Sequence, residues 1–555
     1  MRLRFWLPAI VTVSGAFAQP SPMVAPHSVV NSASIVPASI PGGWIAQGSI
    51  FSMYGTNLGP AQPLTQTGFP LSTQLGSFIV RVVQGTTVAN AIPIYASPTR
   101  IDAIMPSTAP LGMVSIQVLN GVVRGNMAPA RVTGASFGIY TANQIGFGPG
   151  QIQNINDDGS TTQNTAASPA VQGQTVTLSG TGLGAIAGDD SQPPADGDIP
   201  QATVEVFVGG ESTTVVSNGR DPCCGGQDQI TFQVPADALL GCYVPVLVRL
   251  NGTVPSNSAT MAISSDGSAC SDPGNPLSNA IINGGDLALA VALRSAIRED
   301  IGTKSPTDVI SDNAALYLRT ETGGSQAFNP VFSLPPPGSC MTLAGAGDWF
   351  TKGAIPGTAP GGGYFKGPAN LAITGQGSSK IVPLGSPNGL AMLKIGSFVS
   401  TFAKVPSTIF LNPGNTYLTA AAAAPLGGIS ASLVMPAVPN WSNRDQVSPI
   451  DRTQDLTVTF DPVDPSLTVL IAGGAVDVPT YSTALFACVA PPGSNSFTVP
   501  AAVLSTLPAS RPLPIDTKGI LYVGTVSAPA SFSPAGIDFG IGLAVALNGK
   551  TVIFQ

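Results

Sequence analysis

QGSIFSMYGTNLGP at residues 47–60 and QGQTVTLSGTGLGA at residues 172–185 are two copies of one pattern. Each copy has a Gln-Gly pair, an alternating stretch and then Gly-Thr-x-Leu-Gly. Phe51 and Met53 alternate with more polar neighbours, as do the equivalent apolar residues of the second copy, which is the period of a half-buried strand. The glycines that follow allow a tight exit from the strand. The repeat therefore predicts a duplicated β-domain.

A second landmark repeats in the same order. PTRIDAIMPSTAPLGMVSIQVLNG at residues 98–121 matches QDQITFQVPADALLGCYVPVLVRLNG at residues 227–252. Short strands separated by turn residues at this spacing are typical of Ig-like sandwiches. We therefore expect one Ig-like repeat over residues 28–135 and a second over residues 136–266.

The composition predicts several β-domains with an uncharged surface. The chain has 555 residues, and about 150 residues is a usual domain length. Glycine (64) and proline (52) are abundant, while hydrophobic residues make up 43% of the chain, which favours many short packed strands over disorder. Charged residues are only 9%, and the net charge of −7 offers no basic stripe, so nucleic acid is not an expected partner.

The N-terminus has the features of a secretory signal peptide over residues 1–18. Arg2 and Arg4 precede an apolar run, and Ala16-Phe17-Ala18 is a small-x-small cleavage site. The run is shorter than the ~20 apolar residues of a membrane-spanning helix, and we expect no transmembrane segment in the mature chain. The protein is therefore expected to be secreted, extracellular or at the cell surface.

The six cysteines are expected to form disulfide bonds, because an even number in an exported chain favours oxidation. They are Cys223, Cys224, Cys242, Cys270, Cys340 and Cys488. The first four lie close in sequence and are expected to pair among themselves, with Cys242 and Cys270 joined to Cys223 and Cys224. A vicinal Cys223–Cys224 bond is the alternative. Cys340 and Cys488 remain as the last pair.

The repeated half of the chain also resembles a known family. VVNSAS at residues 29–34, the Gly-Thr-x-Leu-Gly exits, SPTRIDAIMP and DQITFQVPADALLGCYVPV occur in the order seen in the paired IPT/TIG-like modules of secreted acidobacterial proteins. The type is known as the Solibacter C-terminal domain family. The resemblance covers residues 29–264 and implies an Ig-like fold and secretion. It implies no ligand and no catalytic residue.

The second half is expected to be β as well, with one connector helix. Residues 267–310 are assigned to a linker and a helix, because Leu289, Leu293 and Ile297 recur every four residues between Asp286 and Ile301. Residues 311–435 are expected to form a β-domain. Residues 436–555 are expected to form a C-terminal β-sandwich, since LTVTF and the stretch around Cys488 resemble the module that ends other secreted acidobacterial proteins.

The sequence offers little for catalysis. His27 is the only histidine, which removes histidine-based triads and metal sites. We expect no enzyme and no cofactor, although a pair of carboxylates is formally available. Trp44, Trp349 and Trp441 are isolated from one another, which favours roles as core anchors over sugar-stacking platforms.

Two loops are the candidates for binding. The loop at residues 59–77 is uncharged, whereas the loop at residues 184–200 is acidic, so we expect them to face different partners. A calcium ion held by the acidic loop is one interpretation, and a solvated acidic loop is the favoured one. The calcium ligands would be Asp189, Asp190, Asp196 and Asp198.

Three functions stay open at this stage. The expected one is an extracellular binding or scaffolding module for polysaccharide, envelope material or protein. The alternatives are a glycan-active enzyme with paired carboxylates and a purely structural spacer.

Cleavage after Ala18 is the first testable prediction, because the charged start, the apolar run and the small-x-small site coincide. Intact mass spectrometry of the exported protein should give a chain that starts at Gln19. A mature protein that still starts at Met1 would contradict secretion and the disulfide assignment that rests on it.

Overall fold

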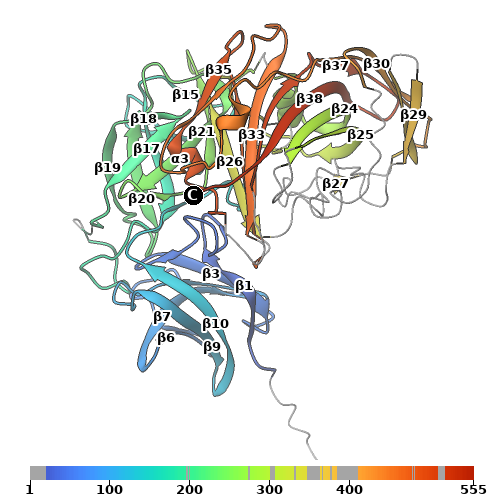
Figure 1. Ribbon diagram of the computed structural model, residues 1–555. Helices are drawn as coiled ribbons and strands as arrows, with labels where there is room; N and C mark the ends of the chain where they lie inside the picture. The colour runs from blue at the N-terminus through green and yellow to red at the C-terminus, as the bar shows by residue number, and fades with distance from the viewer. Residues whose placement is uncertain are drawn as a thin grey trace, which may run out of the picture.

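The computed structural model describes residues 20–195, 198, 200–272, 275–299, 307–330, 333–346, 363–364, 367–375, 378–383, 411–477, 479–480, 482–510 and 519–555. The expected signal peptide and its cleavage site at Ala18 lie outside these residues. The prediction of a mainly β chain of tandem sandwiches is confirmed. Figure 1 shows a first unit in blue, a second in green and a third that runs from yellow-green to red.

The first unit is a sandwich around one apolar core. Its strands are β1 Met23–Asn31, β2 Ile45–Ala46, β3 Ile50–Thr56, β4 Leu64–Thr65, β5 Gln74–Leu75, β6 Phe78–Gln84, β7 Thr87–Ala96, β8 Arg100–Ile104, β9 Gly112–Asn120 and β10 Val123–Thr133. The first half of β7 pairs with β6 and its second half with β8, so this strand joins the two layers. Side chains of both layers, Met53 of β3 and Val80 of β6 among them, share the core.

The second unit is a sandwich of two separate sheets. Its strands are β11 Gly138–Ile139, β12 Gly148–Pro149, β13 Ile152–Ile155, β14 Thr161–Gln163, β15 Ala170–Val171, β16 Thr175–Thr181, β17 Val204–Val208, β18 Glu211–Thr213, β19 Val215–Arg220, β20 Asp228–Gln233, β21 Gly241–Leu250, β22 Val254–Pro255 and β23 Ala259–Ser264. One sheet has the order β14-β13-β16-β20-β19 and the other β12-β23-β21-β17-β18.

The two copies of the sequence pattern pair in the same register. Met53 of β3 lies opposite Ile101 of β8, and Leu178 of β16 lies opposite Ile230 of β20. These four side chains are fully buried. The repeated sequence patterns therefore form the same antiparallel strand pair in both units.

The third unit is built on a long central sheet. Its helices are α1 Pro276–Asn283, η1 Arg444–Gln446 and α3 Ala501–Leu504, and its strands are β24 Gly285–Glu299, β25 Thr307–Glu321, β26 Cys340–Ala346, β27 Gly363–Tyr364, β28 Asn370–Gly375, β29 Ser378–Pro383, β30 Gly414–Ala420, β31 Ile429–Met435, β32 Leu456–Thr459, β33 Thr468–Asp477, β34 Ser482–Val489, β35 Ser496–Val499, β36 Gly519–Val526, β37 Ala530–Phe532 and β38 Phe539–Val552. The order of the central sheet is β26-β34-β33-β36-β38-β24-β25-β27.

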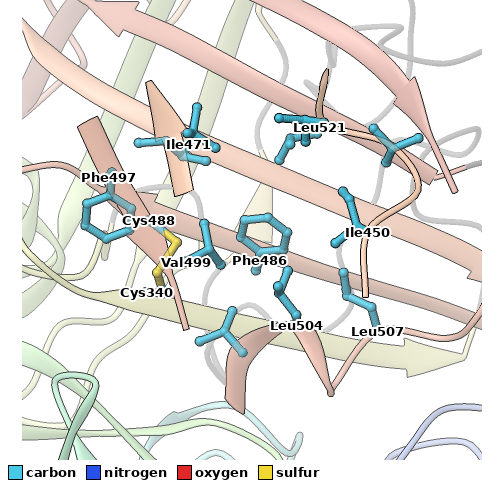
Figure 2. Packing of buried hydrophobic residues seen from close by; sticks show 14 of the residues in the cluster. Cys340, Ile450, Ile471, Phe486, Cys488, Phe497, Val499, Leu504, Leu507 and Leu521 are labelled. Carbon is cyan, nitrogen blue, oxygen red and sulfur yellow. A yellow bond between two sulfur atoms is a disulfide. The ribbon is translucent and has the colours of Figure 1, made fainter. Parts of the chain in front are cut away.

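Smaller layers cover the central sheet. The sheet β29-β28-β30-β31 packs on the alanine face of β24, and the pair β32-β35 with α3 packs over β33, β34 and β36. Figure 2 shows this second core, where Phe486 and Ile471 of the sheet meet Val499 and Leu504 beside the Cys340–Cys488 bond. The ranges 267–310, 311–435 and 436–555 all contribute to the central sheet, and the expected boundary at residues 310 and 311 falls inside β25.

The prediction of a helix over Asp286–Ile301 is wrong. Residues 285–299 form β24, which pairs with β25 on one side and with β38 on the other. A spacing of four residues also fits the period of two, and here leucines at odd positions pack in one core while Ala288, Ala290 and Ala292 pack in another. A strand that is buried on both faces has no polar side, so the spacing of its leucines does not distinguish it from a helix. The connecting helix is α1, which lies just before this strand.

The segment 31–44, called here the junction segment, connects all three units. The buried Asn31 side chain donates hydrogen bonds to the carbonyl oxygens of Ser136 (3.2 Å) and Thr181 (3.1 Å) of the second unit. Further along the segment, Val36 and Ile40 pack in the core of the third unit. A short piece of the first unit is therefore part of the folded structure of the other two.

Three disulfide bonds join the six cysteines, namely Cys223–Cys224, Cys242–Cys270 and Cys340–Cys488. The expected pairing of Cys242 and Cys270 with Cys223 and Cys224 is wrong. Cys223 and Cys224 lie in the turn between β19 and β20, whereas Cys242 lies on β21 among the residues that contact the third unit. The two pairs belong to different parts of the second unit.

Replacing Asn31 should weaken the whole assembly. N31A leaves two buried carbonyl oxygens and two buried N–H groups without their partners, which should lower the free energy of unfolding by on the order of 3 kcal/mol. N31D has the same size but cannot donate to the two carbonyls, and it should be destabilised as well. Calorimetric melting measures the effect. N90A, at an exposed position of β7, is the matched control, and equal melting temperatures for N31A and N90A would contradict the role of Asn31.

The Cys340–Cys488 bond should contribute most among the disulfides. It closes a loop of 148 residues, for which the chain-entropy model gives about 5 kcal/mol. C340A/C488A should therefore melt well below the parent protein. C223S/C224S removes a bond between adjacent residues, which restricts the unfolded chain little, so its melting temperature should stay close to that of the parent. A larger loss in the second variant would overturn this ranking.

Candidate functional site

A cleft of about 400 Å³ lies where the junction segment meets the third unit, and Thr253 of the second unit also borders it. Clefts of this volume are the usual size for small-molecule sites. Its lining includes an aromatic ring, a cation, a carboxylate and several hydroxyl groups. The residues used below are Ser39, Trp44, Thr253, Arg452, Asp477 and Ser505.

Trp44 forms the aromatic side of the cleft and is held in one orientation. Its Nε1 donates a hydrogen bond to the Ala38 carbonyl oxygen (3.2 Å), and the guanidinium of Arg131 lies 4.0 Å from the ring centroid. The tight turn before it requires Gly42 and Gly43, because a Cβ there would lie 2.2 Å from the Pro255 oxygen or 2.0 Å from the Pro37 oxygen. The partly exposed ring is therefore fixed before any ligand arrives.

The polar side of the cleft belongs to the third unit. Arg452 donates to the carbonyl oxygens of Leu507 (2.7 Å) and Gln555 (3.1 Å), and burial lowers the pKa of its guanidinium. Asp477, which is 4% exposed, accepts a hydrogen bond from the Thr480 hydroxyl (2.6 Å). These bonds fix both charged groups in place.

One hydrogen bond ties the two sides together. The hydroxyl groups of Ser39 and Thr480 lie 2.7 Å apart, so the junction segment contacts the turn that follows β33. Because Thr480 also binds Asp477, the position of the carboxylate depends on the position of the junction segment. The cleft is a property of the assembled units rather than of one sandwich.

The groups that line the cleft can bind a sugar. Asp477 is the only carboxylate among the described residues that line the cleft, whereas glycoside hydrolysis generally uses two. A sugar ring has apolar C–H faces and equatorial hydroxyl groups. A fixed indole ring beside hydroxyl, carboxylate and guanidinium groups matches both features.

The expectation that the tryptophans are core anchors is wrong for Trp44. Trp441 is 3% exposed and belongs to the core of the third unit, as expected, while Trp349 lies outside the described residues. Trp44 is partly exposed and borders the cleft. Its position directly after Pro41-Gly42-Gly43 is a usable signal, because Pro-Gly and Gly-Gly pairs mark turns and loops, which usually lie at the surface.

The residues expected to bind calcium have other contacts where the structure describes them. Asp190 accepts hydrogen bonds from the backbone N–H (2.6 Å) and the hydroxyl (2.8 Å) of Ser107, and burial raises the pKa of its carboxyl. Asp189 accepts from the Ser191 N–H, which lowers its pKa, and Asp198 accepts from the Ala195 N–H. Asp196 lies outside the described residues, and calcium binding by this loop stays a prediction.

The two loops contact each other, and the expectation that they face different partners stays a prediction. The backbone N–H of Leu71, in the loop at residues 59–77, donates to the Ser191 carbonyl oxygen (2.7 Å) of the acidic loop. Asp190 of the acidic loop also binds Ser107 of the first unit. The two loops therefore meet and hold the first two units together.

The cysteines offer no metal site in the described part of the chain. Asp221, Cys223 and Cys224 lie close enough together to share an ion. Both sulfur atoms are consumed by the Cys223–Cys224 bond, and a thiolate is the form that binds metal. This group is therefore structural.

No protein-family model and no curated protein matches the chain. Several solved structures show a distant likeness. They include the plexin A4 extracellular region (15% identity, 44% of this chain and 18% of that chain, TM-score 0.17), a mixed-linkage glucan SGBP-B of Bacteroides ovatus with a heptasaccharide (14%, 54% and 66%, TM-score 0.21) and a xyloglucan-locus SGBP-B of Bacteroides uniformis (8%, 90% and 89%, TM-score 0.16).

These scores are too low to transfer an activity or a ligand to this chain. The chain spans 18% of the plexin structure and 66% of the Bacteroides ovatus protein. The resemblance to the IPT/TIG-like family stays a prediction, because no family model matches the chain. In the described residues, no helix has the length and apolar character needed to cross a membrane.

Proposed function

We propose that the protein is a secreted, non-catalytic polysaccharide-binding protein, and that the Trp44 cleft holds a segment of neutral glycan. The observation that carries this proposal is the fixed, partly exposed indole ring of Trp44 at the edge of a cleft of about 400 Å³. The ring would stack on the apolar face of one sugar unit. The hydroxyl groups of Ser39, Thr253 and Ser505 would bind sugar hydroxyls.

The charges of the cleft favour a neutral ligand. Arg452 is the only cation and Asp477 the only carboxylate among the described lining residues, so their charges balance. The net charge of the chain, −7, works against the approach of a polyanion. Binding should therefore depend little on ionic strength.

The fixed side chains that line the cleft should increase its affinity for a ligand. Trp44, Arg452 and Asp477 each make hydrogen bonds to the protein that fix their side chains. A ligand then loses less free energy to the ordering of the site than it would in a mobile loop.

Removing the indole ring tests the proposal. A glycan array with the mature protein should first identify neutral polysaccharides that bind. W44A should then weaken binding about tenfold or more in isothermal titration calorimetry, because a buried aromatic anchor commonly carries a large share of the binding energy. W44F, which keeps an aromatic face, should lose less.

A matched variant separates stacking from general surface effects. Tyr417 is 46% exposed on β30 of the four-stranded sheet, so Y417A also removes an exposed aromatic ring but should leave binding unchanged. Equal binding by W44A and the parent protein would contradict the site. Release of reducing sugar ends from the bound glycan would instead support the glycan-active enzyme, and no binding to any glycan would support the structural spacer.

A further inference from the structure

A second cleft, of about 230 Å³, lies between the first and second units. The first unit contributes one side through β3, β8 and the start of the junction segment. The second unit contributes the other side through residues near β11 and β12 and through the turn before β20. The side chains that carry functional groups into it are Tyr54, Arg100, Tyr140, Gln144, Gln151 and Gln227.

Arg100 is held at the edge of this cleft with hydrogen-bond donors to spare. Its Nε donates to Asp102 Oδ1 (2.7 Å), and its guanidinium carbon lies 6.0 Å and 5.6 Å from the ring centroids of Tyr54 and Tyr95. Within the described residues, neither Nη1 nor Nη2 has an acceptor at hydrogen-bond distance. These two nitrogen atoms remain available for a ligand.

The opposite side is rich in carboxamides. The side-chain amides of Gln144 and Gln151 are exposed and make no hydrogen bond to any residue that the structure describes. Gln227 is fixed by a hydrogen bond to Asp221 (2.9 Å), and the Tyr140 hydroxyl lies 2.9 Å from that of Ser32. The cleft thus combines two amide side chains that can reorient, those of Gln144 and Gln151, with two side chains that are fixed by hydrogen bonds, those of Gln227 and Tyr140.

Two residues at this cleft have an unfavourable backbone conformation. Ile35 has φ 54° and Gln144 has φ 57°. A positive φ is rare for residues with a side chain and especially for a β-branched one, because the Cβ atom then crowds the backbone. Such residues concentrate at functional sites, and here two of them border the same cleft from different units.

The charges around the cleft favour a ligand without net charge. Arg100 is paired with Asp102, and Arg220 of the second unit is paired with Asp228 at 2.5 Å. Asp221 is the further carboxylate beside Gln227. No excess positive charge is therefore available, among the described residues, to hold an anion such as a uronic acid.

The combination of amides and small apolar groups fits an acetamido group. A carboxamide offers a donor and an acceptor at once, so it can bind both the N–H and the C=O of a ligand amide. Ala33 and Ile35 border the same cleft and can contact a methyl group. A plain hexose has neither an amide nor a methyl group to match these walls.

We infer that the cleft between the first and second units binds an N-acetylated sugar, and that Gln144, Gln151 and Arg100 form hydrogen bonds with its acetamido group. The inference rests on the proposed glycan-binding function for its ligand class, but it concerns a separate cleft that does not include Trp44. The two clefts would let one chain hold a neutral hexose polymer and an amino-sugar polymer together.

The test uses the full-length mature protein carrying W44A, so that the first cleft does not contribute. Binding of the β-linked tetramer of N-acetylglucosamine is compared with binding of the glucose tetramer of the same linkage by calorimetry. The first tetramer should bind at least tenfold more tightly than the second. Adding Q144A and Q151A should weaken its binding by about tenfold or more, because these exposed side chains contribute to the ligand and not to the core.

Further variants keep the test decisive. R100K retains a positive charge beside Asp102 but loses the planar pair of donors, and it should also weaken binding of the N-acetylated tetramer. The inference is overturned if W44A binds both tetramers equally, binds neither, or binds the first equally with and without Q144A and Q151A. Loss of hexose binding by W44A with retained binding of the N-acetylated tetramer would support the second cleft whatever the outcome for the first.

Discussion

The assembly of this protein depends on one buried carboxamide. The Asn31 side chain is fully buried and uses its whole hydrogen-bonding capacity, with two bonds donated to the second unit and two accepted from Ala33 and Ser34 in its own segment. The approach is so close that Gly138 cannot carry a side chain, since a Cβ there would lie 2.4 Å from Asn31 Oδ1. A buried polar group that is fully satisfied specifies one arrangement of its neighbours, because any other arrangement leaves donors or acceptors unpaired.

The junction segment that starts at Asn31 is also a wall of both clefts. Ala33 and Ile35 border the cleft between the first and second units, while Ser39 and Trp44 border the cleft at the third unit. Between them, Val36 is buried in the core of the third unit. Both clefts are therefore formed when the units come together, and their walls are as rigid as the contacts that hold the units in place.

The sequence predicted the strands better than it predicted how the units meet. The Gly-Thr-x-Leu-Gly repeat predicted a strand pair in both of the first two units, because alternation and turn glycines are local signals. The leucines of β24 misled the assignment because spacing by four satisfies both the helical and the strand period, and only the neighbouring strands β25 and β38 decide between them. The disulfide partner of Cys242 likewise depends on tertiary distance, which sequence separation does not give.

The candidate sites were least visible in the sequence, since each is made by residues far apart along the chain. Trp44 and Asp477 line the same cleft but are separated by most of the length of the chain. Arg100 and Gln151 belong to different units. VVNSAS at residues 29–34 carries no local signal of a contact between units. The position of Asn31 between two sandwiches depends on carbonyl oxygens more than 100 residues away. Contacts between units are best sought in motifs that lie next to the end of a strand and do not follow the alternation of apolar and polar residues.

The most direct test of this account is a crystal structure of the mature protein with the neutral oligosaccharide that binds it best. The account predicts a sugar ring stacked on Trp44, with Ser39 and Thr480 still in contact and the cleft walls unmoved. A sugar bound elsewhere on a sheet face, or a cleft that exists only because the junction segment has moved away from the third unit, would contradict it.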